Sequence, residues 1–226
     1  LDGGKNVYRR DWLEGAGSEG ELAVFSNGIA VAAPAGWWID HPDLFADIDY
    51  VNNRVRINGV SYPSYEAAQQ AGVIKASGSL QYIDAAIGTE FTLAGSGIGF
   101  RSINAEQVLV ALDDGDDAVS NDNYAALAID TGAKGVATVR SDGVGQFNQK
   151  SLTGFGSGAL FSAAVTVRTA TPNGYAKMGS EVFSDDAALA PSGITRLCLL
   201  NRSVSPTPWL GTAKRIVLIK APMTQA

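Results

Sequence analysis

The feature that most constrains this chain is a series of short segments in which apolar and polar residues alternate. Residues 160–168 show it most clearly, because every second position is apolar: Phe161, Ala163, Val165 and Val167. Successive side chains of a strand point to opposite faces, so such a segment buries one face and leaves the other polar. The pattern recurs in residues 108–112, 135–140, 194–200 and 214–220. A chain of half-buried strands with few helices has to pack two sheets together or close a barrel.

Turn residues separate these segments. Asp130-Thr131-Gly132 and Ser141-Asp142-Gly143 are two examples, and further Gly-, Asn- and Asp-rich turns follow one another at short intervals from about residue 85 onward. Further strands are expected at 90–93, 124–129 and 174–178, with Gly95-Ser96-Gly97 as a break after the first of them. This spacing predicts an all-β fold, a two-sheet antiparallel sandwich.

The first part of the chain predicts a different organisation. Residues 1–36 are rich in Gly and Ala, with one possible strand at 21–25, and we expect this arm to lie against the main domain, a neighbouring subunit or a larger assembly. Residues 47–57 predict a hairpin that turns at Asn52-Asn53, with a second turn at Asn58-Gly59. A short helix is expected over 65–71, capped by Ser64 and ended by Gly72.

These signals divide the chain into two parts at the turn-rich segment Ser77-Gly78-Ser79. Residues 1–80 are predicted to form an N-terminal arm and a small module with the hairpin and the helix. Residues 81–226 are predicted to form the sandwich. At 226 residues the chain is long enough for both parts.

Charge and composition exclude several classes of partner. The formal net charge of −6 comes without a basic stripe, which argues against a nucleic-acid partner. No apolar stretch reaches the roughly 18–20 residues that span a bilayer, so membrane insertion is not expected. The N-terminus also lacks the basic start and apolar stretch of a signal peptide. The single cysteine, Cys198, lies in an apolar run, which predicts a buried, inert thiol and no disulfide framework.

Possible catalytic groups fail the requirements of the chemistry they would perform. Asp47 and Asp49 share one face of a strand, but they lie before the sandwich and lack flanking glutamates, so we interpret them as surface charge of the hairpin. The only histidine, His41, has no nucleophile elbow near it and cannot form a zinc site alone. The G-x-G-x-x-G spelling at residues 15–20 precedes a strand and is chance composition. We therefore expect no catalytic residue, no cofactor and no enzyme activity.

A metal site is left open by the acidic turn at residues 113–117. Asp113, Asp114, Asp116 and Asp117, with Asp122 nearby, could offer oxygen ligands to calcium. Calcium takes six to eight oxygens, including carbonyls that a sequence does not reveal. A solvated hairpin tip is the alternative interpretation of the same residues.

Residues 45–222 carry a resemblance to a known family. The stretches 91–93, 108–115 and 128–130, continued by 137–143, 189–199 and 210–218, resemble a concanavalin A-like (laminin-G-like) jelly roll. The last of them is similar to the final strand of such domains in structural proteins of tailed bacteriophages and prophages. The block 45–65 is similar to a segment that often precedes the jelly roll in those virion proteins.

The resemblance implies a virion structural or appendage protein, located on the surface of a phage-like particle, of the tail-fibre, spike or head-decoration type. It also implies homo-oligomers formed through the N-terminal arm, other virion proteins as partners, and binding of host-surface glycan. A decoration or connector protein with only protein partners is the alternative, and a polysaccharide-cleaving enzyme is a third.

Sugars stack on aromatic rings and accept hydrogen bonds from polar groups near loops. The residues that fit this requirement at predicted loop positions are Tyr124, Tyr175, Asn201, Arg202 and Trp209. The pair Trp37-Trp38 is expected to anchor the N-terminal segment on the sandwich or on a partner subunit.

Overall fold

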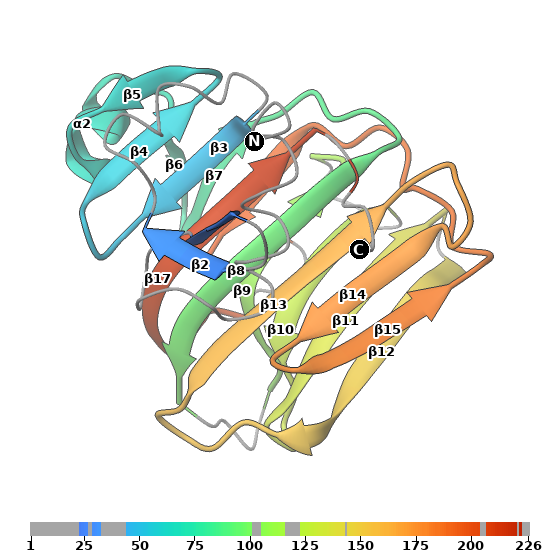
Figure 1. Cartoon of the computed structure of the whole chain (residues 1–226). Coiled ribbons are helices and arrows are strands. Elements are labelled where there is room, and N and C mark those ends of the chain that lie inside the picture. Colours follow the sequence, from blue (N-terminus) through green and yellow to red (C-terminus); the bar gives the residue numbers. More distant parts are fainter. Residues whose placement is uncertain are drawn as a thin grey trace.

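The computed structural model describes residues 23–26, 29–32, 44–100, 105–115, 123–142, 144–203, 207–220 and 222. Within these residues two antiparallel sheets form a sandwich, with one short helix at its side (Figure 1). The all-β, two-sheet antiparallel fold that the sequence predicts is therefore confirmed. None of the helices in the described part of the chain is long and apolar enough to cross a bilayer.

The strand order of both sheets departs from chain order. The seven-stranded sheet runs β12 (Val144–Gly154), β11 (Lys134–Ser141), β10 (Tyr124–Ile129), β9 (Gln107–Asp113), β16 (Arg196–Leu199), β7 (Leu80–Asp84), β6 (Lys75–Ser77). The eight-stranded sheet runs β15 (Glu181–Asp185), β14 (Gly174–Met178), β13 (Leu160–Val167), β8 (Phe91–Gly99), β17 (Gly211–Ile219), β3 (Leu44–Asp49), β4 (Arg54–Ile57), β5 (Val60–Tyr62). A separate hairpin joins β1 (Ala23–Ser26) to β2 (Ile29–Ala32).

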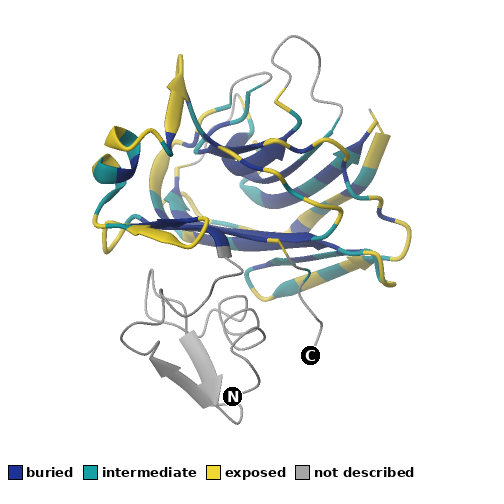
Figure 2. Ribbon diagram, turned by 90° about the horizontal axis from the view of Figure 1, so that it is seen from above, coloured by how far each residue is buried: buried dark blue, intermediate teal, exposed yellow. Residues whose placement is uncertain are grey.

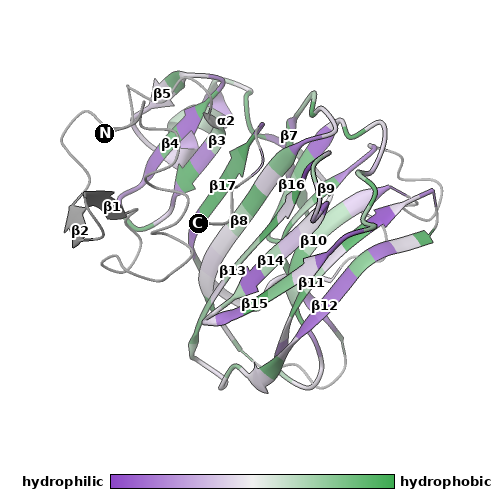
Figure 3. Cartoon of the chain, turned by 45° about the vertical axis from the view of Figure 1, so that its right-hand side comes forward, coloured by the Kyte–Doolittle hydropathy of each residue, from purple (hydrophilic) through white to green (hydrophobic). Residues whose placement is uncertain are grey.

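The core lies between the two sheets and is built from the alternate residues that the sequence pattern assigned to one face. Leu93 of β8, Leu109 of β9 and Leu218 of β17 are fully buried there. The ring of Phe161 contacts Phe155 edge-to-face, with ring centroids 5.0 Å apart. Figure 2 shows the buried residues along both layers, and Figure 3 shows hydrophilic residues gathered on the edge strands β12 and β15. Burial of this shared apolar surface is what holds the layers together.

The predicted break at Gly95-Ser96-Gly97 is wrong, because β8 continues through these residues to Gly99. Gly95 and Gly97 face the interior, where there is no room for a side chain. A Cβ atom built on Gly95 would lie 2.8 Å from Leu109 Cδ2, and one on Gly97 would lie 2.7 Å from the carbonyl oxygen of Thr212. The glycines here permit close packing and do not end the strand.

The predicted hairpin and helix are present. β3 and β4 pair antiparallel, with Asn53 in the turn at φ 50°. Asn58 (φ 51°) and Gly59 (φ 80°) then connect β4 to β5. Helix α2 spans Tyr65–Gln70, and the Ser64 hydroxyl accepts a hydrogen bond from the Ala67 amide at its start.

The predicted division at residue 80 falls inside the two sheets. β3 is hydrogen-bonded to β17 in the eight-stranded sheet, and β6 is hydrogen-bonded to β7 in the seven-stranded sheet. Residues 44–77 are therefore part of the same sandwich as the strands that follow them. For the segment before residue 44, the division stays a prediction.

Candidate functional site

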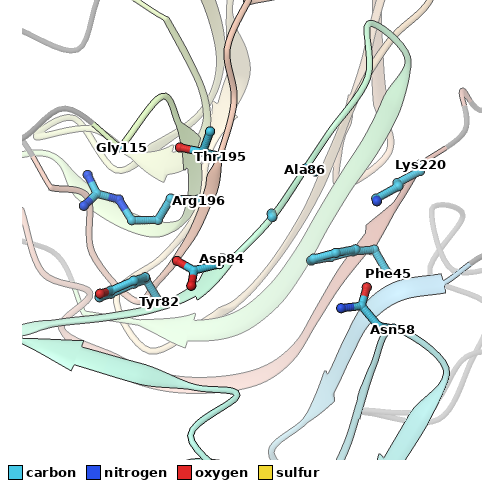
Figure 4. Close-up of a pocket in the computed structure, with 10 residues that line it drawn as sticks. Phe45, Asn58, Tyr82, Asp84, Ala86, Gly115, Thr195, Arg196 and Lys220 are labelled. Carbon is cyan, nitrogen blue, oxygen red and sulfur yellow. The ribbon is translucent and has the colours of Figure 1, made fainter.

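A pocket of about 680 Å³ lies at one end of the sandwich, where strand ends from both sheets meet (Figure 4). The side that belongs to the seven-stranded sheet is formed by Tyr82, Asp84, Ala85, Gly115, Thr195 and Arg196. The other side is formed by Phe45, Asn58 and Lys220 of the eight-stranded sheet and its turns. Figure 4 shows Phe45, Asn58 and Lys220 on one side and Asp84 and Tyr82 on the other, with the Arg196 guanidinium pointing away from Phe45 and Lys220.

Arg196 is held in place by the register of the seven-stranded sheet. It is aligned with Asp84 of β7 on one side and with Asp113 of β9 on the other. Its Nε donates to Asp113 Oδ1 at 2.8 Å, and the Asp113 side chain is fully buried. Asp113 also accepts hydrogen bonds from the Ser203 hydroxyl at 2.8 Å and the Gly115 amide at 3.0 Å. The guanidinium is therefore held in place by a buried counter-charge.

Tyr82 supports the same guanidinium from the neighbouring strand. The Arg196 Cζ atom lies 5.6 Å from the centroid of the Tyr82 ring, a cation–π arrangement. Beside it, the exposed carboxylate of Asp84 forms an ion pair with Lys75 of β6. The negative charge of Asp84 is thus matched by a lysine, as the positive charge of Arg196 is matched by Asp113.

Lys220 is the basic group of the opposite side. Its ammonium lies 4.8 Å from the centroid of the Phe45 ring, whose residue is buried. Lys220 is exposed and forms no ion pair with any described residue. Asn58 lies beside Phe45, because its backbone N–H donates to the backbone carbonyl of Phe45 at 2.7 Å. The pocket therefore combines one ring-supported ammonium, that of Lys220, with amide, hydroxyl and carboxylate groups.

The five predicted site residues do not form one site. Tyr124 of β10 lies on the outer face of the seven-stranded sheet, aligned with Asp113 and Arg140. Tyr175 of β14 is aligned with Thr166, on the outer face of the other sheet. The two tyrosines therefore face away from each other, with the core between them, and neither lines the pocket.

The other three predicted residues lie together near the loop after β16, where two of them have structural roles. Asn201 is buried, and its Oδ1 accepts hydrogen bonds from the Arg202 and Thr207 amides at 2.9 and 3.0 Å. Trp209 is only 7% exposed and packs against Phe161, with ring centroids 5.8 Å apart. Arg202 is half-buried and lies 4.0 Å from Glu106.

Sequence reasoning missed Tyr82, Asn58, Arg196 and Lys220 as site residues. Each lies in a different part of the chain, and only the crossed strand order brings them together. The sequence Asn58-Gly59 predicts a turn, but nothing in the neighbouring residues indicates that the Asn58 side chain lines a pocket.

The interpretation of Asp47 and Asp49 as surface charge is wrong, since both are buried. Burial raises the pKa of Asp47, and the charge of Arg215, which donates to it at 2.7 Å, opposes that rise. Asp49 accepts hydrogen bonds from the Val51 and Asn52 amides of the hairpin turn. Alternation showed that the two carboxylates share a face, but it could not show which basic residue lies beside them.

Cys198 is buried, as the sequence predicts, and burial next to Asp113 raises the pKa of its thiol. No group of three or more His, Cys, Asp or Glu side chains in the described part of the chain is arranged to hold a metal ion. Asp116, Asp117 and Asp122 of the acidic turn lie outside the described residues, as do His41, Trp37, Trp38 and residues 15–20.

No protein-family model matches the sequence, and no curated protein matches it. Among solved structures, the chain is similar to the CBM40 of the Ruminococcus gnavus IT-sialidase bound to α2,3-sialyllactose, with 15% identity and a TM-score of 0.51 over 62% of this chain and 80% of that chain. The same CBM40 without the sugar gives 15% identity and a TM-score of 0.50 over 61% and 79%. This likeness confirms the jelly-roll sandwich. The predicted relation to phage virion proteins stays a prediction.

Proposed function

We propose that this protein is a carbohydrate-binding module whose pocket at the strand ends takes an acidic sugar. The observation that carries the proposal is the exposed ammonium of Lys220, which lies over the Phe45 ring at the rim of an open pocket and forms no ion pair among the described residues. A carboxylate prefers such a cation, while Asn58, Asp84 and Thr195 offer hydrogen-bond partners to sugar hydroxyls. A CBM40 of similar fold binds sialyllactose, which supports the same class of ligand here.

Lys220 is the group that gives the pocket its preference for negative charge. Asp113 and Asp84 are each paired with a basic side chain, whereas Lys220 forms no ion pair among the described residues. An uncompensated ammonium at an exposed rim is available to a ligand carboxylate. Its position over the Phe45 ring limits the freedom that it would lose on binding.

We propose further that the protein binds sugar without cleaving it. Hydrolysis of a glycosidic bond uses two carboxyl groups on either side of the bond. Among the described residues that line the pocket, only Asp84 carries a carboxyl group, and Lys75 pairs with it. Asp47 and Asp49, the other pair considered from the sequence, are buried away from the pocket.

Calorimetry with 3′-sialyllactose and with lactose tests the proposal. Binding of sialyllactose, with weaker or no binding of lactose, is the expected result. Lys220→Gln should weaken sialyllactose binding about tenfold, the loss expected for one charged hydrogen bond of about 1.4 kcal/mol. Lys150→Gln removes the same charge from an exposed lysine paired with Asp130, and should leave the affinity unchanged. Equal affinity for both sugars, or equal effects of both variants, would refute the acidic-sugar site.

The sequence resemblance is the basis for three further expectations. These are a location on a phage-like particle, virion proteins as partners, and an oligomer formed through the N-terminal arm. Such a location is compatible with a glycan-binding module, because many copies on one particle would multiply weak contacts. If the protein binds no sugar in a glycan array yet associates with purified particles, the connector alternative is favoured.

A further inference from the structure

The pocket residue Asn58 is followed by a glycine, and this sequence favours attack on the asparagine side chain by the next backbone nitrogen. Glycine has no side chain to block that approach, and its backbone adopts many conformations. The chain contains three such pairs, Asn27-Gly28, Asn58-Gly59 and Asn173-Gly174. The first lies outside the described residues. The other two have the same sequence in different surroundings, so the structure distinguishes their reactivity.

Asn58 and Gly59 form the exposed turn between β4 and the edge strand β5, where Ile57 lies opposite Val60. Their φ angles of 51° and 80° are those that an Asn-Gly hairpin turn favours. No described residue forms a hydrogen bond with the Asn58 side chain or accepts one from the Gly59 N–H. A Cβ atom built on Gly59 would meet nothing within 4 Å. Both reacting groups therefore lie in a turn that opens at little cost.

Asn173 and Gly174 are held on both sides of the bond that would have to rearrange. The Asn173 side-chain nitrogen donates to the carbonyl oxygens of Arg168 and Thr169, at 3.3 and 2.9 Å. Gly174 is buried in β14, which is hydrogen-bonded to β13 and β15. Attack by its nitrogen requires that these bonds break and that the strand leaves the sheet. Such an opening costs more free energy than opening of an exposed turn.

We propose that Asn58 is a deamidation site and that its deamidation weakens the binding of acidic sugars; the second part rests on the proposed function. The Gly59 backbone nitrogen gives up its proton to solvent and attacks the Asn58 Cγ atom. A C–N bond forms, and the side-chain nitrogen leaves as ammonia. Water then opens the five-membered imide and leaves aspartate or isoaspartate at this position. The net change consumes one water and releases one ammonia, so it needs no other reactant; asparagine is thermolabile for this reason.

The change of charge takes place inside the pocket. Asn58 and Lys220 both line it, and Figure 4 shows the Phe45 ring between them. Deamidation replaces a neutral amide with a carboxylate on the side of the pocket that holds the Lys220 ammonium. The new carboxylate attracts this ammonium and repels the carboxylate of an acidic sugar. We expect the affinity to fall about fivefold, the effect of a like charge a few ångströms from the ligand in a solvated site.

Peptide mass spectrometry of the full chain, incubated at mildly alkaline pH, tests the modification site. In the folded protein Asn58 should deamidate at least about tenfold faster than Asn173, because opening the strand is more costly than opening the turn. In urea the two residues should deamidate at similar rates, since both precede glycine. Asn58→Gln keeps an amide but requires a larger ring for the same attack. It should abolish the fast conversion and leave the slow one at Asn173 unchanged.

Calorimetry with 3′-sialyllactose tests the effect on the pocket. Incubated wild type and fresh Asn58→Asp should both bind about fivefold more weakly than fresh wild type, while the affinity of Asn58→Gln should not change with incubation. Equal rates at Asn58 and Asn173 in the folded protein would overturn the modification site. Complete conversion of Asn58 without loss of affinity would overturn its effect on binding. If fresh wild type binds no sialyllactose, the proposed function fails, and the mass spectra still decide the modification site.

Discussion

Arg215 donates two hydrogen bonds to Asp47, from Nε at 2.9 Å and from Nη2 at 2.7 Å, across a sequence separation of 168 residues. The pairing of β17 with β3 makes this possible, since Val217 lies opposite Asp47 and Arg215 is one row away on the same face. Both side chains are at most 2% exposed. This pair joins the first strand of the described sandwich to its last.

Removing one partner of this pair should be far more damaging than removing both. Arg215→Met leaves the Asp47 carboxylate buried without its counter-charge, and we expect a loss of about 3–5 kcal/mol in the free energy of unfolding. The double variant Asp47→Leu/Arg215→Met should recover most of that loss, because it buries no unpaired charge. Urea denaturation at neutral pH measures both changes.

Arg54→Met is the matched control, because its side chain is 47% exposed and lies 3.5 Å from Asp49. The Arg54 guanidinium is half exposed, and the buried Asp49 keeps its hydrogen bonds from the Val51 and Asn52 amides, so the loss should be at most about 1 kcal/mol. If Arg215→Met proves as mild as Arg54→Met, the buried pair has no special role in stability.

Glu181 should make stability depend on pH in the acid range. Its carboxylate accepts hydrogen bonds from the Leu152 and Thr153 amides at 2.6 and 2.9 Å, so it ties β15 of one sheet to β12 of the other. These bonds lower the pKa of Glu181 below its ordinary 4.5. A lowered pKa in the folded state gives stability that is present above the unfolded pKa and is lost as the pH falls through the folded pKa.

Glu181→Gln should therefore be less stable than the wild type at pH 7, and the difference should shrink below about pH 4.5. Thermal unfolding over a series of pH values measures this. Asp186→Asn removes a charge from an exposed neighbour, so its curve should run parallel to that of the wild type. A Glu181→Gln deficit that persists unchanged into acid would contradict the role given to the carboxylate.

Tyr65 should make stability depend on pH at the alkaline end. Burial raises its pKa from 10.0 to about 12, and its hydroxyl donates to Gln81 beside the half-buried Tyr50. A raised pKa of an acid in the folded state gives stability that is complete below pH 10 and is lost as the pH rises towards 12. Burial also raises the pKa of the neighbouring Tyr50 well above 10.0, so absorbance of tyrosinate during a pH titration should show more than one late-ionising tyrosine, and Tyr65→Phe should remove one of them. In denaturant every tyrosine should titrate near pH 10. A late phase of unchanged amplitude in Tyr65→Phe would contradict the assignment to Tyr65, because Tyr50 alone should then account for less of it.

The sequence was sufficient for the fold class because strand periodicity and turn residues are local properties. Alternation at residues 160–168 and the turn at Asn58-Gly59 both needed only neighbouring residues, and the structure contains both elements. Helix α2 could be predicted in the same way, because the residues that mark its start and its end, Ser64 and Gly72, are close to it in the sequence.

Strand pairing and the burial of outer faces could not be predicted from the sequence, because they depend on residues that lie far apart in the chain. The glycines of β8 were predicted to interrupt the strand, because the sequence does not show that the Leu109 side chain packs against Gly95. Trp209 was predicted to contact a ligand on the basis of its loop position, yet it packs into the core on Phe161. The pocket residues were missed for the same reason, since Tyr82 and Lys220 come together only through the crossed strand order.

Comparison of Tyr82 with Tyr175 separates the pocket from the sites predicted by sequence. Both tyrosines are half-buried, one at the pocket and one on the outer face of the opposite sheet. Tyr82→Ala removes an aromatic ring that lines the pocket, so affinity for an acidic oligosaccharide should fall about tenfold, or about 1.4 kcal/mol. Tyr82→Phe keeps the ring and should keep most of the affinity. Calorimetry with sialyllactose measures each variant; if Tyr175→Ala weakens binding and Tyr82→Ala does not, the sugar binds on the outer face of the eight-stranded sheet and the pocket is not its site.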